Sequence, residues 1–174
     1  FVYLDAGINY KLNKHIHLCL AYVFNEKKQK TDFWSTRHQI YFSCTLKKSI
    51  HYTTFDYRTM AQWQVKDVRS SANGRYPEYY LRGKTTIKYE RHFKLQPYVA
   101  NEVYYFLTQR DAPSIYHFNR SRYFAGIYYH PDLKNEFELY YLFENNFNIT
   151  RRSSSYAINP QNNYIIGIGY SRAL

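Results

Sequence analysis

Apolar residues recur at every second position in nine separate stretches of the chain, and this period of two limits the fold more than any other feature. A helix would place its apolar residues three and four positions apart, whereas residues two apart share one face of a β-strand. The pattern predicts an all-β, antiparallel, up-and-down sheet of about nine strands. The predicted strands are residues 2–12, 16–24, 34–46, 55–63, 79–89, 99–107, 122–129, 136–144 and 164–170.

The predicted connections alternate in length. Short turns at one end and long polar loops at the other are typical of an outer-membrane β-barrel. We therefore expect residues 1–174 to form a single transmembrane barrel domain in the bacterial outer membrane. The short turns are predicted near Asn13–Lys14, Lys47–Lys48, Arg91–Lys94 and Pro131–Lys134, and the longer loops at residues 25–32, 65–77, 108–117 and 146–161.

The aromatic content supports strands at a membrane, although a soluble alternative stays open. Aromatic residues make up 21% of the chain, with 22 Tyr. A mean hydropathy of −0.65 argues against transmembrane helices, but the polar lumen of a barrel would also lower this average. In a soluble lipocalin-like binder, the same aromatic side chains would pack the core. Nine fit interfacial girdles at strand ends: Tyr3, Tyr10, Trp34, Trp63, Tyr79, Tyr89, Tyr105, Tyr129 and Tyr170.

Oppositely charged residues meet on the polar face of two predicted hairpins. Centring each hairpin on its turn pairs Arg82 with Glu102, and Arg120 with Glu144. Such pairs suit a lumen crossed by ion pairs, whereas on a solvated surface they would add little stability. We therefore predict a plugged or narrow lumen with these two ion pairs. The candidate ligand contacts in the lumen, around Glu102, are Tyr98, Tyr104, Lys84 and Arg122.

The net charge of +11 has two interpretations: Lys and Arg on turns and loops keep the protein soluble, or they contact an anionic partner such as phosphate-bearing lipid or nucleic acid. Lys27, Lys28 and Lys30 lie beside Phe33 and Trp34, in one of the predicted long loops. Basic loops of an outer-membrane barrel would contact lipid A phosphates. A nucleic-acid interface would need a binding module, which the sequence does not contain, so we expect no nucleic acid. Other outer-membrane proteins are the further expected partners.

The sequence predicts no catalytic site. A lipid hydrolase would need Ser, His and a polar partner. His117 lies four residues before Ser121, but no acid completes the set. We predict a non-enzymatic protein, with the lipid hydrolase left open as an alternative.

Neither a metal site nor a disulfide is predicted, and we expect no cofactor. His15 and His17 share a strand face, but no carboxylate is placed to complete a metal site. Cys19 falls on the polar face and Cys44 on the apolar one. We therefore expect two free thiols, with Cys19 nearest Gln39 on the neighbouring strand.

Four ordered segments carry a resemblance to a known family: INYKLNKHIHLCLAYVF, YERHFKLQPYVANEVYYFL, RYFAGIYYHPDLKNEFELYYLF and NNYIIGIGY. Together they resemble an uncharacterised outer-membrane β-barrel family, a domain of unknown function common in Bacteroidota. The chain departs from the family at the HPDLKN turn and lacks a terminal aromatic residue in Ser171–Leu174. The resemblance implies a fold and a location but supplies no catalytic residues.

Strand direction leads to a further expectation. If the long loops are extracellular, the first strand begins outside, whereas bacterial barrels begin in the periplasm and have an even strand number. We therefore expect at least one strand before Phe1, giving ten or twelve in all, after a signal peptide. The expected role is a structural or accessory subunit of an outer-membrane assembly. A narrow, porin-like channel for small solutes is the alternative.

Overall fold

The computed structural model describes residues 2–28, 34–66, 77–91, 94–107, 118–152 and 155–172. Within these ranges the chain forms nine strands and no helix, and each predicted strand is present. The strands are β1 (Val2–Lys11), β2 (Ile16–Lys28), β3 (Trp34–Ile50), β4 (Thr53–Lys66), β5 (Pro77–Tyr89), β6 (Leu95–Phe106), β7 (Phe118–Tyr129), β8 (Asn135–Arg152) and β9 (Ser155–Arg172).

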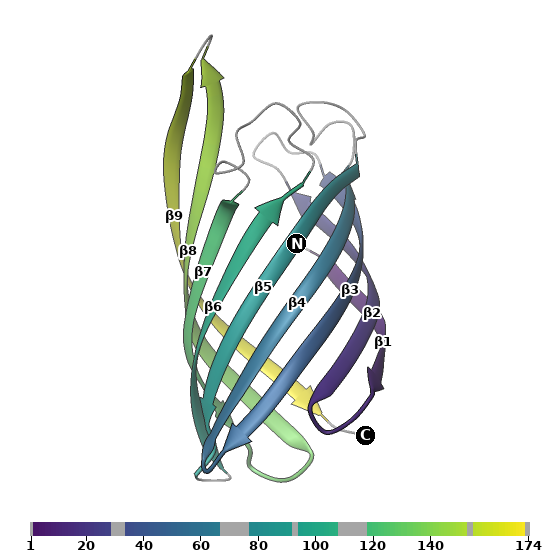
Figure 1. The fold of residues 1–174 in the computed structure, drawn as a ribbon, viewed down its shortest axis with the longest axis vertical. Coiled ribbons are helices and arrows are strands. Elements are labelled where there is room, and N and C mark those ends of the chain that lie inside the picture. Colours follow the sequence, from purple (N-terminus) through teal and green to yellow (C-terminus); the bar gives the residue numbers. More distant parts are fainter. Residues whose placement is uncertain are drawn as a thin grey trace.

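All nine strands belong to one sheet, in which each strand pairs antiparallel with its sequence neighbours. The sheet curls into a half-barrel, so that β1 and β9 form its two edges (Figure 1). Between these edges no hydrogen-bonded pairing is present in the described residues. The up-and-down order predicted from the alternation is therefore confirmed.

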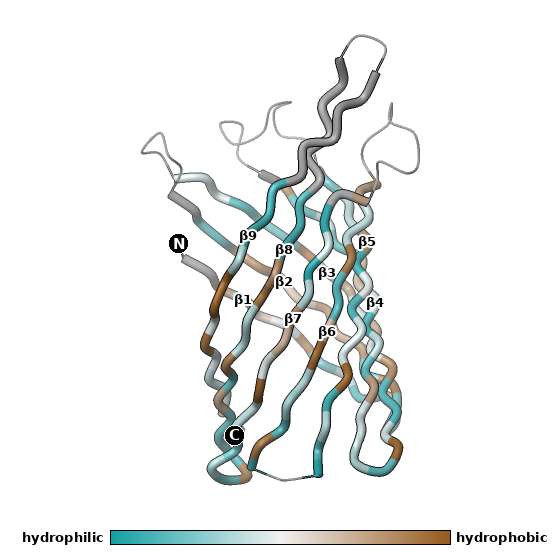
Figure 2. Tube along the Cα trace, turned by 90° about the vertical axis from the view of Figure 1, so that its left-hand side faces the viewer, coloured by the Kyte–Doolittle hydropathy of each residue, from teal (hydrophilic) through white to brown (hydrophobic). Residues whose placement is uncertain are grey.

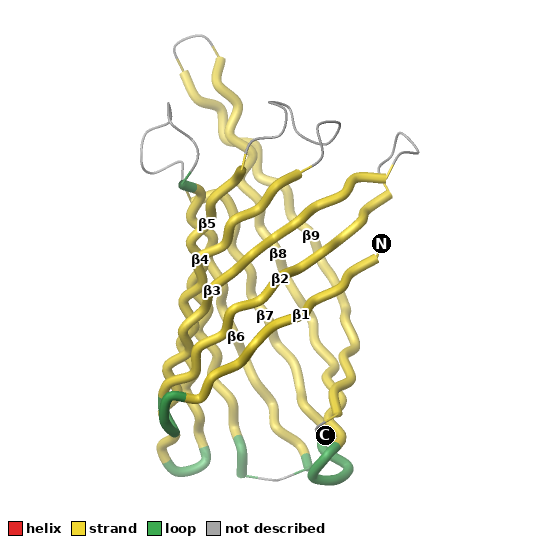
Figure 3. Tube along the Cα trace, turned by 90° about the vertical axis from the view of Figure 1, so that its right-hand side faces the viewer, coloured by secondary structure: helices red, strands yellow, loops and turns green. Residues whose placement is uncertain are grey.

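The described turns, which join β1 to β2, β3 to β4, β5 to β6 and β7 to β8, lie at one end of the sheet (Figure 3). We call this end the turn end and the opposite end of the strands the loop end. At the loop end, the β8–β9 hairpin extends beyond the other strands (Figure 1). The loop predicted at residues 146–161 is therefore wrong: pairing continues to Arg152 and Ser155, because backbone hydrogen bonds do not require apolar side chains. The predicted loop at 25–32 also begins later, since β2 continues to Lys28. The predicted loop at 108–117 lies outside the described residues.

One predicted turn is displaced by four residues. Lys47 and Lys48 lie inside β3, in register with Asp56 and Phe55, and the chain reverses at His51–Tyr52 instead. His51 has a positive φ of 52°, the left-handed conformation that a tight two-residue hairpin turn requires. Two consecutive lysines favour a turn in the sequence. In the structure they belong to a strand, where consecutive side chains point to opposite faces of the sheet.

The two faces of the sheet are inverted relative to a soluble barrel. Along β6, Val99 on the outer face is 55% exposed, whereas Glu102 on the inner face is 2% exposed. On β4, Gln62 and Gln64 are buried while Trp63 between them is exposed. The strands accordingly alternate between hydrophobic and hydrophilic residues along their length (Figure 2). The polar side chains face the interior of the curl and the apolar ones face outward.

Candidate functional site in the interior of the sheet

Glu102 is the centre of a polar layer on the inner face. It lies on β6, and its side chain is 3% exposed. Arg82 from β5 donates to its Oε1 at 2.7 Å, and the Tyr104 hydroxyl donates to its Oε2 at 3.1 Å. Arg122 from β7 lies 3.7 Å from the same Oε2. Three strands therefore converge on one buried carboxylate.

Glu144 on β8 forms the second half of this layer. The Nε of Arg122 donates to Glu144 Oε2, while the terminal nitrogen of Arg122 donates to the Tyr104 hydroxyl. Asn146 donates to Glu144 Oε1 at 2.8 Å and accepts a hydrogen bond of 2.7 Å from Arg120. Arg122 thus bridges the two carboxylates.

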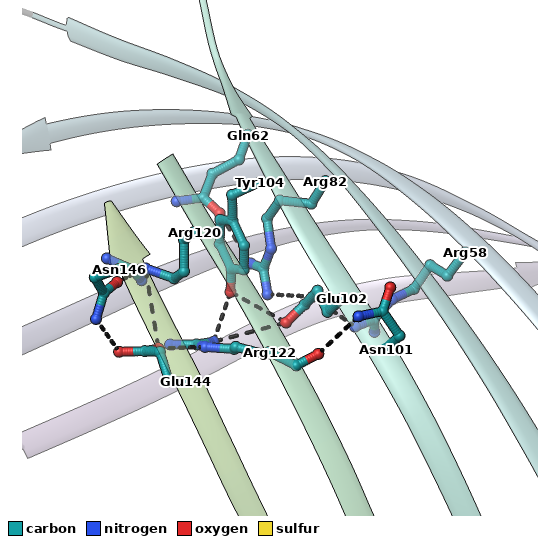
Figure 4. A network of polar contacts seen from close by, with 10 residues as sticks. All are labelled: Arg58, Gln62, Arg82, Asn101, Glu102, Tyr104, Arg120, Arg122, Glu144 and Asn146. Atoms are coloured by element: carbon teal, nitrogen blue, oxygen red, sulfur yellow. Dashed lines mark hydrogen bonds and ion pairs between the residues drawn. The ribbon is translucent and has the colours of Figure 1, made fainter. Parts of the chain in front are cut away.

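The ring of Tyr104 joins the charged groups. The guanidinium carbons of Arg82, Arg120 and Arg122 lie 4.5, 5.0 and 5.1 Å from its centroid, within range of cation–π attraction. Arg82 also donates to Gln62 on β4 at 3.0 Å, so the contacts extend from β4 to β8 (Figure 4). We refer to Gln62, Arg82, Glu102, Tyr104, Arg120, Arg122, Glu144 and Asn146 as the polar layer.

Both ion pairs anticipated from the sequence are in contact, but the predicted registers are wrong by two residues. Arg82 is in register with Tyr104 and reaches Glu102 diagonally. Arg120 is in register with Asn146 and lies 3.9 Å from Glu144. A shift of two residues keeps every side chain on its face, so the diagonal neighbours still meet.

An asymmetric turn explains the shift in the β7–β8 hairpin. The Asp132 side chain accepts the backbone N–H groups of Lys134 and Asn135, both at 2.8 Å. Beyond this Asx-type turn, Asn135 and Glu136 of β8 have no register partner on β7. The last pair of the hairpin therefore joins Tyr129 to Phe137. Centring the hairpin on its sequence midpoint missed this asymmetry.

The remaining candidate ligand contacts are also on the inner face. The Tyr98 hydroxyl donates to Glu138 at the turn side of the polar layer. Lys84 is in register with Glu102, and its Nζ lies 4.5 Å from the centroid of the Phe124 ring. The structure thus brings Tyr104 and Arg122 into the polar layer and places Lys84 beside it, while Tyr98 belongs to a separate contact.

Several residues of the site were missed by the sequence analysis. Gln62 and Asn146 lie at even-numbered positions, as the other polar inner-face residues of β4 and β8 do. Their position in the alternation could therefore have placed them on the inner face. Arg58, on β4, lies 3.8 Å from Glu102 and is on the same face of the strand as Gln62. The identity of the contacts depends on register and on diagonal reach, which alternation alone does not provide.

Other predicted positions lie apart from this site. Both cysteines are free, and Cys19 is in register with Ser43, not with Gln39. The predicted partner was wrong because β2 continues to Lys28, which moves the centre of the hairpin. In the described ranges, no group of three or more His, Cys, Asp or Glu side chains is arranged to hold a metal ion. The basic residue Lys30 and the candidate catalytic residue His117 lie outside the described residues.

A cavity of about 910 Å³ adjoins the polar layer. Small side chains of β1 to β3, among them Gly7, Ala21 and Ser43, leave this space open, and the end of β9 closes one side of it. Arg58 contributes a cation to the lining. The interior therefore has one wall filled by large polar and aromatic groups and an opposite wall with room for a ligand.

The described residues define an all-β protein: one curled antiparallel sheet with a polar, ion-paired inner face. A family model described as "Protein of unknown function (DUF2490)" matches residues 1–156, so the chain belongs to this family. Searches of curated proteins and of solved structures each found no match. Of the residues that the structure describes, none forms a helix long and apolar enough to cross a membrane.

Proposed function

We propose that this protein is a non-enzymatic β-barrel protein of the bacterial outer membrane. The observation that carries the proposal is the inverted distribution of side chains. Phe42 and Leu139 on the outer face are 49% and 51% exposed, whereas Glu102 and Glu144 on the inner face are 2% and 7% exposed. Water disfavours such an apolar outer face, and a lipid bilayer favours it.

Aromatic side chains at both ends of the strands support this location. Trp34, Trp63 and Tyr79 are exposed towards the loop end, and Tyr89 and Tyr129 towards the turn end. Trp and Tyr prefer the two interfaces of a bilayer, where an apolar ring and a polar tip are both satisfied. A soluble lipocalin-like binder would instead direct its aromatic side chains inward.

We propose a structural or accessory role with a plugged or narrow lumen. The polar layer joins five neighbouring strands along the inner face through hydrogen bonds and ion pairs. The large side chains of this layer fill one wall of the interior and leave less room for a wide aqueous pore. A narrow channel for small solutes is the second candidate, because the cavity beside the layer leaves space on the opposite wall.

Migration on a gel tests the membrane location. The full chain, extracted from the outer-membrane fraction in mild detergent, should migrate faster unheated than after boiling, because folded membrane barrels resist the denaturing detergent. Recovery of the chain in the soluble fraction, with identical migration before and after boiling, would refute the proposal.

Conductance across planar bilayers then separates the two candidate roles. A plugged barrel should show no discrete channel openings, whereas a narrow channel should show them at low conductance. The Glu102→Ala variant provides a positive control, because it removes the central acceptor of the layer.

A further inference from the structure

One row of residues crosses the inner face of all nine strands in register. Opposite charges alternate through its second half, from Lys84 to Glu102, Arg122 and Glu144. Arg58 and Lys84, in contrast, are like-charged neighbours on β4 and β5. Like charges directly opposite each other destabilise a sheet. The complete row is Lys11, His17, Thr45, Arg58, Lys84, Glu102, Arg122, Glu144 and Asn163.

Around Arg58 and Lys84, the positively charged side chains outnumber the carboxylates. Four arginines contact only two carboxylates, and Lys84 is in register with one of them. Counting Glu138, which also acts electrostatically on Lys84, two positive charges remain in excess. A partly buried charge without a counter-charge is unfavourable in the interior of a protein. The four arginines are Arg58, Arg82, Arg120 and Arg122.

Arg58 is the arginine of this group that lines the cavity. Its side chain is 37% exposed and that of Arg120 is 39% exposed, compared with 18% for Arg82 and 25% for Arg122. Arg120 donates a hydrogen bond of 2.7 Å to Asn146, which occupies its Nε. The ion contact of Arg58 with Glu102, at 3.8 Å, is longer than a hydrogen bond, and Glu102 is already bonded by Arg82 and Tyr104. Arg58 therefore keeps donor capacity for a ligand.

The cavity beside Arg58 offers further hydrogen-bond donors. Ser43 and Thr45, which carry hydroxyl groups, are among its lining residues, and Thr45 is in register with Arg58. Asp5 is the carboxylate of the lining; it lies on β1 and accepts a hydrogen bond from Tyr41 at 3.3 Å. The β4 side of the cavity thus combines a guanidinium with hydroxyl donors, a donor set that matches an oxyanion.

We propose that the cavity binds a small oxyanion, with a phosphate group as the ligand class, on the Arg58 guanidinium. Thr45 and Ser43 donate hydroxyl hydrogen bonds, and Lys84 supplies a second positive charge beside Arg58. The bound anion offsets the excess positive charge of the four arginines and Lys84. This site depends only on the interior of the sheet, so it is independent of whether the outer face contacts lipid.

Titration of the folded full chain with inorganic phosphate, followed by phosphorus NMR line broadening at constant ionic strength in chloride, tests the site. The wild-type chain should bind phosphate in excess chloride. Arg58→Gln should weaken this binding about tenfold or more, because a charge-assisted hydrogen bond is lost. Lys84→Met should weaken it less, about threefold, because a longer-range attraction is lost.

Arg91→Gln is the matched control, because it makes the same change at an exposed turn residue that lies over the Tyr52 ring. It should bind phosphate as the wild type does, and circular dichroism should show unchanged β content in all variants. Absence of wild-type binding, equal displacement by chloride, or equal weakening by Arg58→Gln and Arg91→Gln would each overturn the proposal.

A parallel titration with a short-chain phosphatidic acid distinguishes the source of the phosphate group. Arg58-dependent binding of this lipid more tightly than inorganic phosphate supports a headgroup ligand. Arg58-dependent binding of inorganic phosphate alone supports a free anion. Lipid binding that does not change in the Arg58→Gln variant would count against the site.

Discussion

At the scale of single residues, Glu102 shows how the interior depends on one buried carboxylate. Arg82 and Arg122 both lie within 4 Å of it, so removing its charge leaves two guanidinium groups short of a partner. Glu102→Gln keeps the shape and should lower the free energy of unfolding by about 3 kcal/mol. Urea unfolding of the folded chain measures this change.

Glu136→Gln is the control for the Glu102 prediction. Glu136 is 37% exposed and lies 3.5 Å from His130. Because exposed ion pairs contribute little, its substitution should cost less than about 1 kcal/mol. Equal costs at the two positions would show that the polar layer is not a stabilising network.

Gly126 is a second residue on which the interior depends. A Cβ at this position would lie 2.7 Å from the Tyr98 ring and 2.8 Å from the Leu139 carbonyl oxygen. Gly126→Ala should therefore reduce the free energy of unfolding by about 1–3 kcal/mol, as overpacking does. At Gly83 the nearest atom would be 3.6 Å away, so Gly83→Ala should fold as stably as the wild type. A loss of stability in the second variant alone would contradict this account.

At the scale of strands and turns, the sequence predicted the elements better than their registers. Alternation identified all nine strands because a period of two is visible wherever the two faces differ in polarity. A two-residue shift leaves that pattern unchanged, which is why Arg82 was paired with Glu102 when its register partner is Tyr104. The end of the β8–β9 hairpin was missed because its sequence is polar and shows no alternation of apolar residues. The two strands pair there all the same, through backbone hydrogen bonds.

The Asp132 turn provides the prediction at this scale. Its carboxylate accepts two backbone N–H groups and the Asn135 side-chain amide, the last at 2.7 Å. Asp132→Ala removes these acceptors and should lower the free energy of unfolding by about 1 kcal/mol. Asp132→Asn keeps an acceptor oxygen and should retain most of the stability. Equal losses in the two variants, measured by urea unfolding, would show that the hydrogen bonds do not hold the turn.

At the scale of the whole molecule, the inverted faces determine the solvent in which the sheet is stable. The two faces of this single sheet differ: ion pairs and hydrogen bonds lie on the inner face, and most of the exposed large apolar side chains lie on the outer face. A soluble barrel with this arrangement would expose its largest apolar side chains to water and bury its charges. The same sheet in a bilayer needs no second layer, because lipid covers the outer face.

Substitution of Val99 by arginine tests whether the outer face contacts lipid or water. Val99 is 55% exposed, and its register partners on either side are Ile87 and Ala125 on the outer face. In lipid vesicles, Val99→Arg should reduce the free energy of unfolding by about 2 kcal/mol, because the charge enters the apolar band. Leu133→Arg, at a turn residue that is 86% exposed, should leave the free energy of unfolding nearly unchanged.

In water, both substitutions are at exposed positions, so each should change the free energy of unfolding by less than about 0.5 kcal/mol. Equal, small effects of the two substitutions in vesicles would therefore show that the apolar face of this sheet does not contact lipid.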